Sequence, residues 1–127
     1  MTTFVDTSVL VSVTLGTEPD SPKAKKAIED LDDEDPAVDT TIITETYLVL
    51  RSKVGTEAAA REASRILRLY AYFTVSKPVV TKALSLVGQV KFGDALIVEH
   101  ARSMRARLLT LDGDQASLLG DRAILVR

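Results

Sequence analysis

Short apolar runs alternate with longer amphipathic stretches along the 127 residues of this chain. The short runs are rich in β-branched and other apolar residues and have the length of buried strands. They cover residues 4–5, 37–38, 72–75, 108–111 and 123–126, the third run being a strand or an extended connector. Strands that alternate with helices predict an α/β fold, in which helices cover both faces of a parallel sheet.

The stretches between these strands have the period of helices, and several end at glycine or proline. Helices are predicted at residues 7–15, 21–31, 41–54, 56–70, 77–87 and 92–106, with a short helix that ends at residue 119. In the 41–54 helix, Ile43, Tyr47, Leu50 and Val54 are predicted to form the apolar face. Thr56 is predicted to cap the next helix, and the acidic run at residues 32–36 is predicted to be a solvated loop.

Composition narrows the class of protein. A chain of this length is expected to form a single domain over residues 1–127, without repeats or a linker. The absence of cysteine excludes disulfides and thiolate metal sites. No basic, apolar leader and no apolar stretch of membrane-spanning length is visible, so we expect a cytoplasmic protein that does not bind membranes.

The charge balance bears on possible partners and chemistry. A net charge of −2 does not indicate a protein held to nucleic acid by bulk positive charge. A polyanion would have to be bound through a local basic patch or a metal ion. Because the chain has one histidine, His100, and no tryptophan, site chemistry must depend on carboxylates, hydroxyls and the backbone.

Four acidic residues stand where an α/β fold places its ligand site. Asp6 and Asp112 follow apolar strands, Glu45 interrupts an apolar helix, and Asp94 begins a helix. Taken singly, each has a simpler explanation as a helix cap or a surface residue. If they converge, each pair at 4 Å repels by about 4 kcal/mol at an effective dielectric constant near 20. Mg²⁺ or Mn²⁺, which take oxygen ligands, would relieve that repulsion.

The same residues resemble the acidic set of PIN domains across almost the whole chain. The matching segments are FVDTSVLV around Asp6, TTIITETY around Glu45, FGDALIVEHA around Asp94 and LLTLDGD around Asp112. At this size the chain looks most like the VapC-type toxins of toxin–antitoxin pairs. The resemblance implies a three-layer α/β/α sandwich with a four- to five-stranded parallel sheet. It also implies a Mg²⁺- or Mn²⁺-dependent endoribonuclease that acts on RNA, forms a homodimer and binds a cognate antitoxin.

Carried onto matching positions, the resemblance makes Asp6, Glu45, Asp94 and Asp112 the metal ligands. Asp114 would be an auxiliary acid, the Ser8 hydroxyl would hold water or substrate, and Thr110 would support the cluster. The chain departs from the family in two places. Gly93 stands where an aromatic residue often precedes the third acid, and Asp114-Gln115 stands where phenylalanine or leucine often follows the fourth.

Other interpretations remain open. A non-catalytic PIN-like module that binds RNA or protein is the main alternative, although all four positions are still acidic. A phosphoaspartyl phosphatase would need a second aspartate at position 8, which is serine. Arg61, Arg65 and Arg68 form either a solvated helix face or a strip that contacts RNA phosphates, with Arg51 and Lys53 as rival candidates. His100, about 240° around a helix from Asp94, is predicted to lie at the surface, away from the site.

Overall fold

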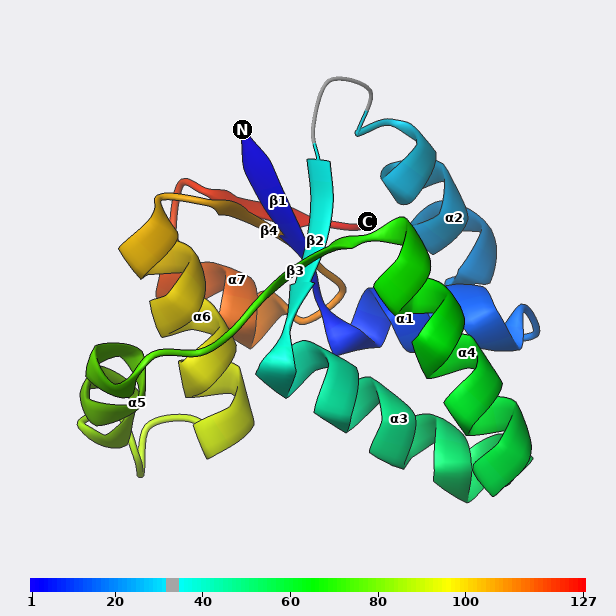
Figure 1. The fold of residues 1–127 in the computed structure, drawn as a ribbon. Coiled ribbons are helices and arrows are strands. Elements are labelled where there is room, and N and C mark those ends of the chain that lie inside the picture. The colour runs from blue at the N-terminus through cyan, green and yellow to red at the C-terminus, as the bar shows by residue number, and fades with distance from the viewer. Residues whose placement is uncertain (32–34) are drawn as a thin grey trace.

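A parallel β-sheet forms the centre of the computed structural model, which describes residues 1–31 and 35–127 (Figure 1). Over these residues the sheet has five strands in the order β3-β2-β1-β4-β5. The strands are β1 (Thr2–Val5), β2 (Asp35–Asp39), β3 (Ala71–Phe73), β4 (Arg107–Thr110) and β5 (Ala123–Leu125). All neighbouring strands pair in parallel, so their carboxyl ends lie along one edge. The predicted α/β fold is confirmed.

Helices cover both faces of the sheet. They are α1 (Thr7–Leu15), α2 (Ser21–Glu29), α3 (Thr40–Val54), α4 (Thr56–Leu69), α5 (Lys77–Leu84), α6 (Phe92–Met104) and α7 (Gly113–Leu119). Figure 1 shows α1 to α4 grouped on one side of the sheet and α5 to α7 on the other. Because the chain reverses its direction across the sheet between β3 and β4, helices leave β1 and β4 toward opposite faces. A crevice at the carboxyl ends of these two strands is the usual ligand position in such sheets.

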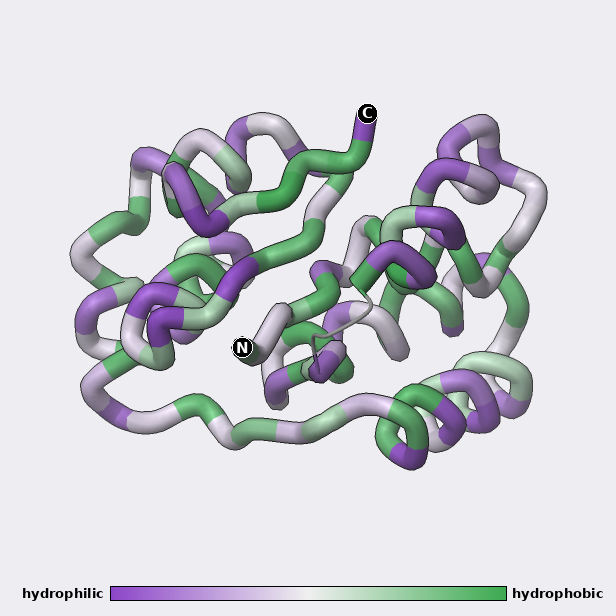
Figure 2. The backbone as a smooth tube through the Cα atoms, turned by 90° about the horizontal axis from the view of Figure 1, so that it is seen from above, coloured by the Kyte–Doolittle hydropathy of each residue, from purple (hydrophilic) through white to green (hydrophobic). Residues whose placement is uncertain are grey.

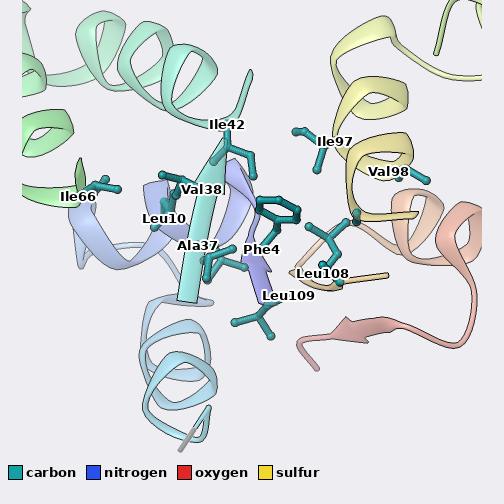
Figure 3. Packing of buried hydrophobic residues seen from close by; sticks show 14 of the residues in the cluster. Phe4, Leu10, Ala37, Val38, Ile42, Ile66, Ile97, Val98, Leu108 and Leu109 are labelled. Carbon is teal, nitrogen blue, oxygen red and sulfur yellow. The ribbon is translucent and has the colours of Figure 1, made fainter. Parts of the chain in front are cut away.

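The core forms where the strands meet the inner faces of the helices. Phe4 on the central strand is fully buried, together with Val38 and Leu108 on the neighbouring strands. Figure 3 shows the Phe4 ring in the middle of this cluster, with Ile42 of α3 and Ile97 of α6 nearby. Figure 2 shows apolar residues along the strands, while polar residues alternate with apolar ones along the helices, as burial of one helix face requires. Within the described ranges, no helix has the length and apolar character needed to cross a membrane.

The buried face of α3 differs from the prediction. Ile42, Thr46 and Leu50 are its buried residues, whereas Ile43 is only partly buried and Val54 is 46% exposed. Thr46 is enclosed because α3 packs against both α1 and α4, and its hydroxyl bonds to the Thr7 hydroxyl at 3.4 Å. A hydropathy pattern counts threonine as a polar position. The predicted apolar face therefore did not include Thr46.

Several predicted boundaries also shift. Of the acidic run at residues 32–36, predicted to be a loop, residues 32–34 lie outside the described residues. Asp35 and Pro36 begin β2 because they pair in register with Thr2 and Thr3. Gly55, not Thr56, occupies the N-cap position of α4, because its positive φ of 91° turns the chain directly from α3 into the next helix. The fifth and sixth helices end at residues 84 and 104, earlier than predicted.

Candidate active site

Aspartates stand at the carboxyl ends of three neighbouring strands. Asp6 follows β1, Asp39 ends β2, and Asp112 stands two residues beyond β4. Each is also the N-cap of the next helix, where its side chain accepts hydrogen bonds from backbone N–H groups. The donors are the N–H groups of Ser8, Ile42, and both Asp114 and Gln115. Because the strands pair in parallel, these capping carboxylates lie along one edge of the sheet.

Asp6 is held by side chains from α1, from the end of β4 and from α7. It is only 5% exposed, and its Oδ2 accepts a hydrogen bond from the Ser8 hydroxyl at 2.6 Å. Gln115 Nε2 donates to Asp6 Oδ1 at 3.3 Å. Thr110 Oγ1 lies 3.2 Å from Asp6 Oδ2 and 2.8 Å from Gln115 Oε1, and its single proton can be donated to either. This network fixes the orientation of the Asp6 carboxylate.

Ser8 and Gln115 both take part in this network, but only Ser8 was predicted from the sequence as a site residue. The Ser8 hydroxyl donates to Asp6 and accepts from the Leu111 N–H at 3.1 Å, so it joins the ends of β1 and β4. Gln115 is 2% exposed and was not predicted from the sequence. Its only sequence indication is its position, three residues after Asp112, where a departure from the PIN pattern was noted.

Glu45 and Asp94 come from α3 and α6 and complete the cluster of carboxylates. Burial, followed by the negative charges of Asp6, Asp94 and Asp39, raises the pKa of Glu45 from 4.5 to about 7. Burial and then the charges of Asp112 and Asp6 raise the pKa of Asp94. The charges of neighbouring acids thus act on both Glu45 and Asp94, and Asp6 acts on both of them.

Gly93 makes room for Glu45. A Cβ atom at position 93 would overlap with the Glu45 carboxylate. The other departure from the PIN pattern thus also lies directly beside one of the acids. Asp94 itself is in the first turn of α6, whose N-cap is Lys91, so it is not a capping residue.

An open pocket of about 820 Å³ lies over this part of the site. Its lining includes the carboxylates of Asp94, Asp112 and Asp114 with the positively charged Lys91. Asp114 is exposed at the rim. The positive charge of Lys91 partly offsets the rise in the pKa values of Glu45 and Asp94, so this charge acts on the acidic cluster. Across the part of the chain that the structure describes, no three acidic or histidine side chains converge tightly enough to form a ready metal cage.

The prediction for His100 was wrong. The side chain is 5% exposed, and its Nδ1 lies 2.7 Å from Oδ2 of the fully buried Asp39. The His100 side chain points into the protein rather than to solvent, because α6 is buried over Ala95 and residues 97–101. Asp39 was also missed, although it ends an apolar strand in the same way as Asp6.

The arginine stripe lies on α4, on the other side of the sheet from α6 (Figure 1). Arg65 forms an ion pair with Glu62 at 2.5 Å, and Glu62 also accepts from the Thr14 hydroxyl. Arg61 and Arg68 line the same shallow surface and are exposed. The stripe therefore does not border the acidic cluster.

The structure is therefore a parallel α/β sandwich with carboxylates gathered where β1 and β4 end. The sequence matches the PIN domain family over residues 3–119, and the chain belongs to this family. A comparison with curated protein sequences gives no significant match.

Solved structures share the fold at low sequence identity. Mycobacterium tuberculosis VapC20, described as a sarcin–ricin loop cleaving toxin, is 19% identical with a TM-score of 0.77, covering 91% of this chain and 94% of that one. A toxin–antitoxin complex from Klebsiella pneumoniae is 16% identical, with a TM-score of 0.76 and 98% of both chains covered. VapBC2 from Rickettsia felis, bound to a promoter DNA fragment, is 16% identical, with a TM-score of 0.74 and coverage of 98% and 97%.

Proposed function

We propose that this protein is a metal-dependent endoribonuclease that hydrolyses RNA phosphodiester bonds at the carboxyl ends of β1 and β4. The observation that carries the proposal is the gathering of Asp6, Glu45, Asp94 and Asp112 from four separate parts of the chain at one edge of the sheet. Glu45 and Asp94 would be easier to ionise if the other acids lay elsewhere, because burial and the neighbouring carboxylates raise the pKa of both. A bound cation would offset this repulsion and so explains why the fold keeps these carboxylates close together. Membership of the PIN family supports the same conclusion.

The donor set fits Mg²⁺ or Mn²⁺. All four side chains offer carboxylate oxygens, the ligands that these hard cations take. Asp6, Glu45, Asp94 and Asp112 would hold the cation, which when bound lowers the pKa of a water molecule and balances negative charge on a phosphoryl group. Closing the carboxylates around one ion requires rearrangement of the side chains, and half-buried Glu45 and Asp94 are freer to move than hydrogen-bonded Asp6.

The protein's own residues prepare the site for a polyanion. Ser8, Thr110 and Gln115 orient Asp6, so its position does not have to be fixed when substrate binds. Lys91 lines the open pocket beside Asp94 and offers a positive charge to a phosphate oxygen. Asp114, exposed at the rim of the same pocket, is suited to an auxiliary role in positioning water or substrate.

We further propose that the protein is the toxin of a toxin–antitoxin pair. The similar solved structures include a toxin that cleaves the sarcin–ricin loop and complexes of toxins with antitoxins. The partners proposed on this ground are an RNA substrate, a cognate antitoxin and a second copy of the chain. Growth arrest on expression, relieved by Asp94→Asn, would support the toxin role, and light scattering of the purified protein would test the dimer.

The nuclease proposal is tested by incubating purified protein with total RNA, with added Mn²⁺ or with EDTA. Cleavage is expected with Mn²⁺ and not with EDTA, and Asp94→Asn is expected to lower its rate about 100-fold or more. Glu57→Gln is the matched control because Glu57 is also an acid in a first helical turn, on α4. Cleavage that persists in EDTA, or that is equal in Asp94→Asn, would reject the mechanism. Cation-independent RNA binding without cleavage would favour a non-catalytic module.

A further inference from the structure

A buried hydrogen bond joins the beginning of α3 to the middle of α6. Asp39 is fully buried, and its two carboxylate oxygens have different partners. Oδ1 accepts from the Ile42 N–H at 2.8 Å and so caps α3, while Oδ2 lies 2.7 Å from His100 Nδ1 on α6. Both oxygens of Asp39 are engaged inside the protein, and its charge also acts on Glu45.

The same pair also contacts the central strand. The His100 ring packs against the Phe4 ring with a centroid separation of 5.0 Å, and Phe4 in turn meets Phe73 edge-on at 5.9 Å. Phe4 lies two residues before Asp6 on β1. His100, on the same helix as Asp94, therefore contacts the strand that precedes Asp6 and the N-cap of the helix that carries Glu45.

The position of the pair opposes the repulsion within the cluster. Ionised Glu45 on α3 and ionised Asp94 on α6 repel each other, and this repulsion favours separation of the two helices. α3 makes fewer contacts with α6 than with α1 and α4, so each direct contact between α3 and α6 matters more for resisting that separation. A hydrogen bond fixes both the distance and the direction between its groups, whereas an apolar contact allows the helices to slide.

We propose that the Asp39–His100 hydrogen bond is a positioning device that sets the separation of Glu45 and Asp94 and thereby the affinity of the acidic site for a divalent cation. His100 and Asp39 are positioning residues, since neither is placed to contact the cation or the RNA. The inference rests on the proposed function, which assigns the cation to this site. It adds that two residues outside the acidic cluster influence the affinity for that cation.

The test compares three substitutions at position 100 by titrating the purified protein with Mn²⁺ and measuring its dissociation constant. His100→Leu removes the donor and keeps most of the volume, and it is expected to weaken Mn²⁺ binding about tenfold or more. His100→Asn keeps an N–H donor close to the place of Nδ1 and is expected to stay within about threefold of the wild type. His100→Gln moves the donor outward and is expected to give an intermediate value. It replaces His100→Leu if that variant does not fold.

Ile66→Ala is the control for a loss of stability alone. Ile66 is 1% exposed on α4, so its truncation destabilises the fold without touching the Asp39–His100 pair. An unchanged Mn²⁺ affinity in folded His100→Leu, or an equal loss in Ile66→Ala, would overturn the inference. Crystal structures of wild type and His100→Leu give a readout that needs no metal: an unchanged Glu45–Asp94 separation also overturns it. Absence of Mn²⁺ binding in the wild type would instead count against the proposed function.

Discussion

The carboxylate of Glu45 on α3 occupies the space where a side chain at position 93 of α6 would begin. Gly93 stands immediately before Asp94, so the missing side chain lets the Glu45 carboxylate lie directly against the backbone that carries the next acid. The contact is made between a flexible side chain and a fixed helix. Glycine at this position therefore determines where Glu45 can lie, and any larger residue must displace it.

Gly93→Ala is expected to move Glu45 and weaken Mn²⁺ binding about tenfold, because the added methyl group takes the place of the carboxylate. The cost in stability should be small, since Glu45 is half-buried and can rotate outward, and alanine favours the helix by about 1 kcal/mol over glycine. Calorimetric titration with Mn²⁺ and urea unfolding measure the two effects separately. Gly113→Ala is the matched control, because a Cβ there meets no atom within 4 Å. Equal Mn²⁺ affinity in both variants would contradict this explanation.

Asp94→Asn is expected to leave the metal-free protein unchanged or more stable. Asp94 is not an N-cap, and its raised pKa shows that the fold disfavours its charge. Asp112→Ala should behave in the opposite way, losing about 1 kcal/mol, because Asp112 Oδ1 accepts two backbone N–H groups at the start of α7. Urea unfolding in EDTA compares the two. A loss of more than about 1 kcal/mol in Asp94→Asn would mean that Asp94 has a structural role after all.

The fold was largely predictable because it depends on regular patterns. Strand and helix periods, glycine at helix ends and the alternation of the two element types predicted the parallel sheet. The acids after β1 and β4 were predictable for the same reason, since strand ends share one edge. Patterns of hydropathy alone did not predict which polar groups would be buried, and Thr46 of α3 is the clearest case in the fold.

In the site, the residues that escaped prediction are those that act through another residue. Gln115 orients Asp6 from a position 109 residues away, and His100 bonds Asp39 across 61 residues. Neither is unusual for its local element, because glutamine and histidine are both accepted on helices. Their importance arises only when tertiary packing buries them beside a carboxylate. Local periodicity contains no information about that pairing.

The metal-free protein is expected to lose stability as the pH rises from about 4.5 to about 7. The folded state raises the pKa of Glu45 to about 7 from 4.5, so it binds a proton that the unfolded chain has released over this interval. The stabilising contribution is fully present below pH 4.5 and is lost as the pH passes through 7; Asp94 acts in the same direction. Because Glu45 is half-exposed, solvent screening reduces the effect to about 1 kcal/mol.

Thermal or urea unfolding in EDTA between pH 4.5 and 8 measures this dependence. Glu45→Gln should flatten the curve and be the more stable protein at pH 8, whereas Glu57→Gln on α4 should retain the wild-type slope. Adding Mn²⁺ at pH 8 should stabilise the wild type, by about 2.7 kcal/mol at a concentration 100 times the dissociation constant. A wild-type curve that rises across this interval would show that Glu45 is not buried among like charges.

Gln115→Leu is expected to destabilise the protein by about 1–3 kcal/mol, because it leaves buried polar atoms of Asp6 and Thr110 without their glutamine partner. Ser117→Ala, at an exposed position of the same helix, is the control and should be nearly neutral. Since the loss is assigned to the contact with Asp6, it should shrink when Asp6 is already replaced by alanine, which has no side-chain acceptor for Gln115 Nε2. Urea unfolding of the two single variants and the double variant measures that coupling. Additive losses would mean that Gln115 stabilises α7 independently of the carboxylate that it is proposed to orient.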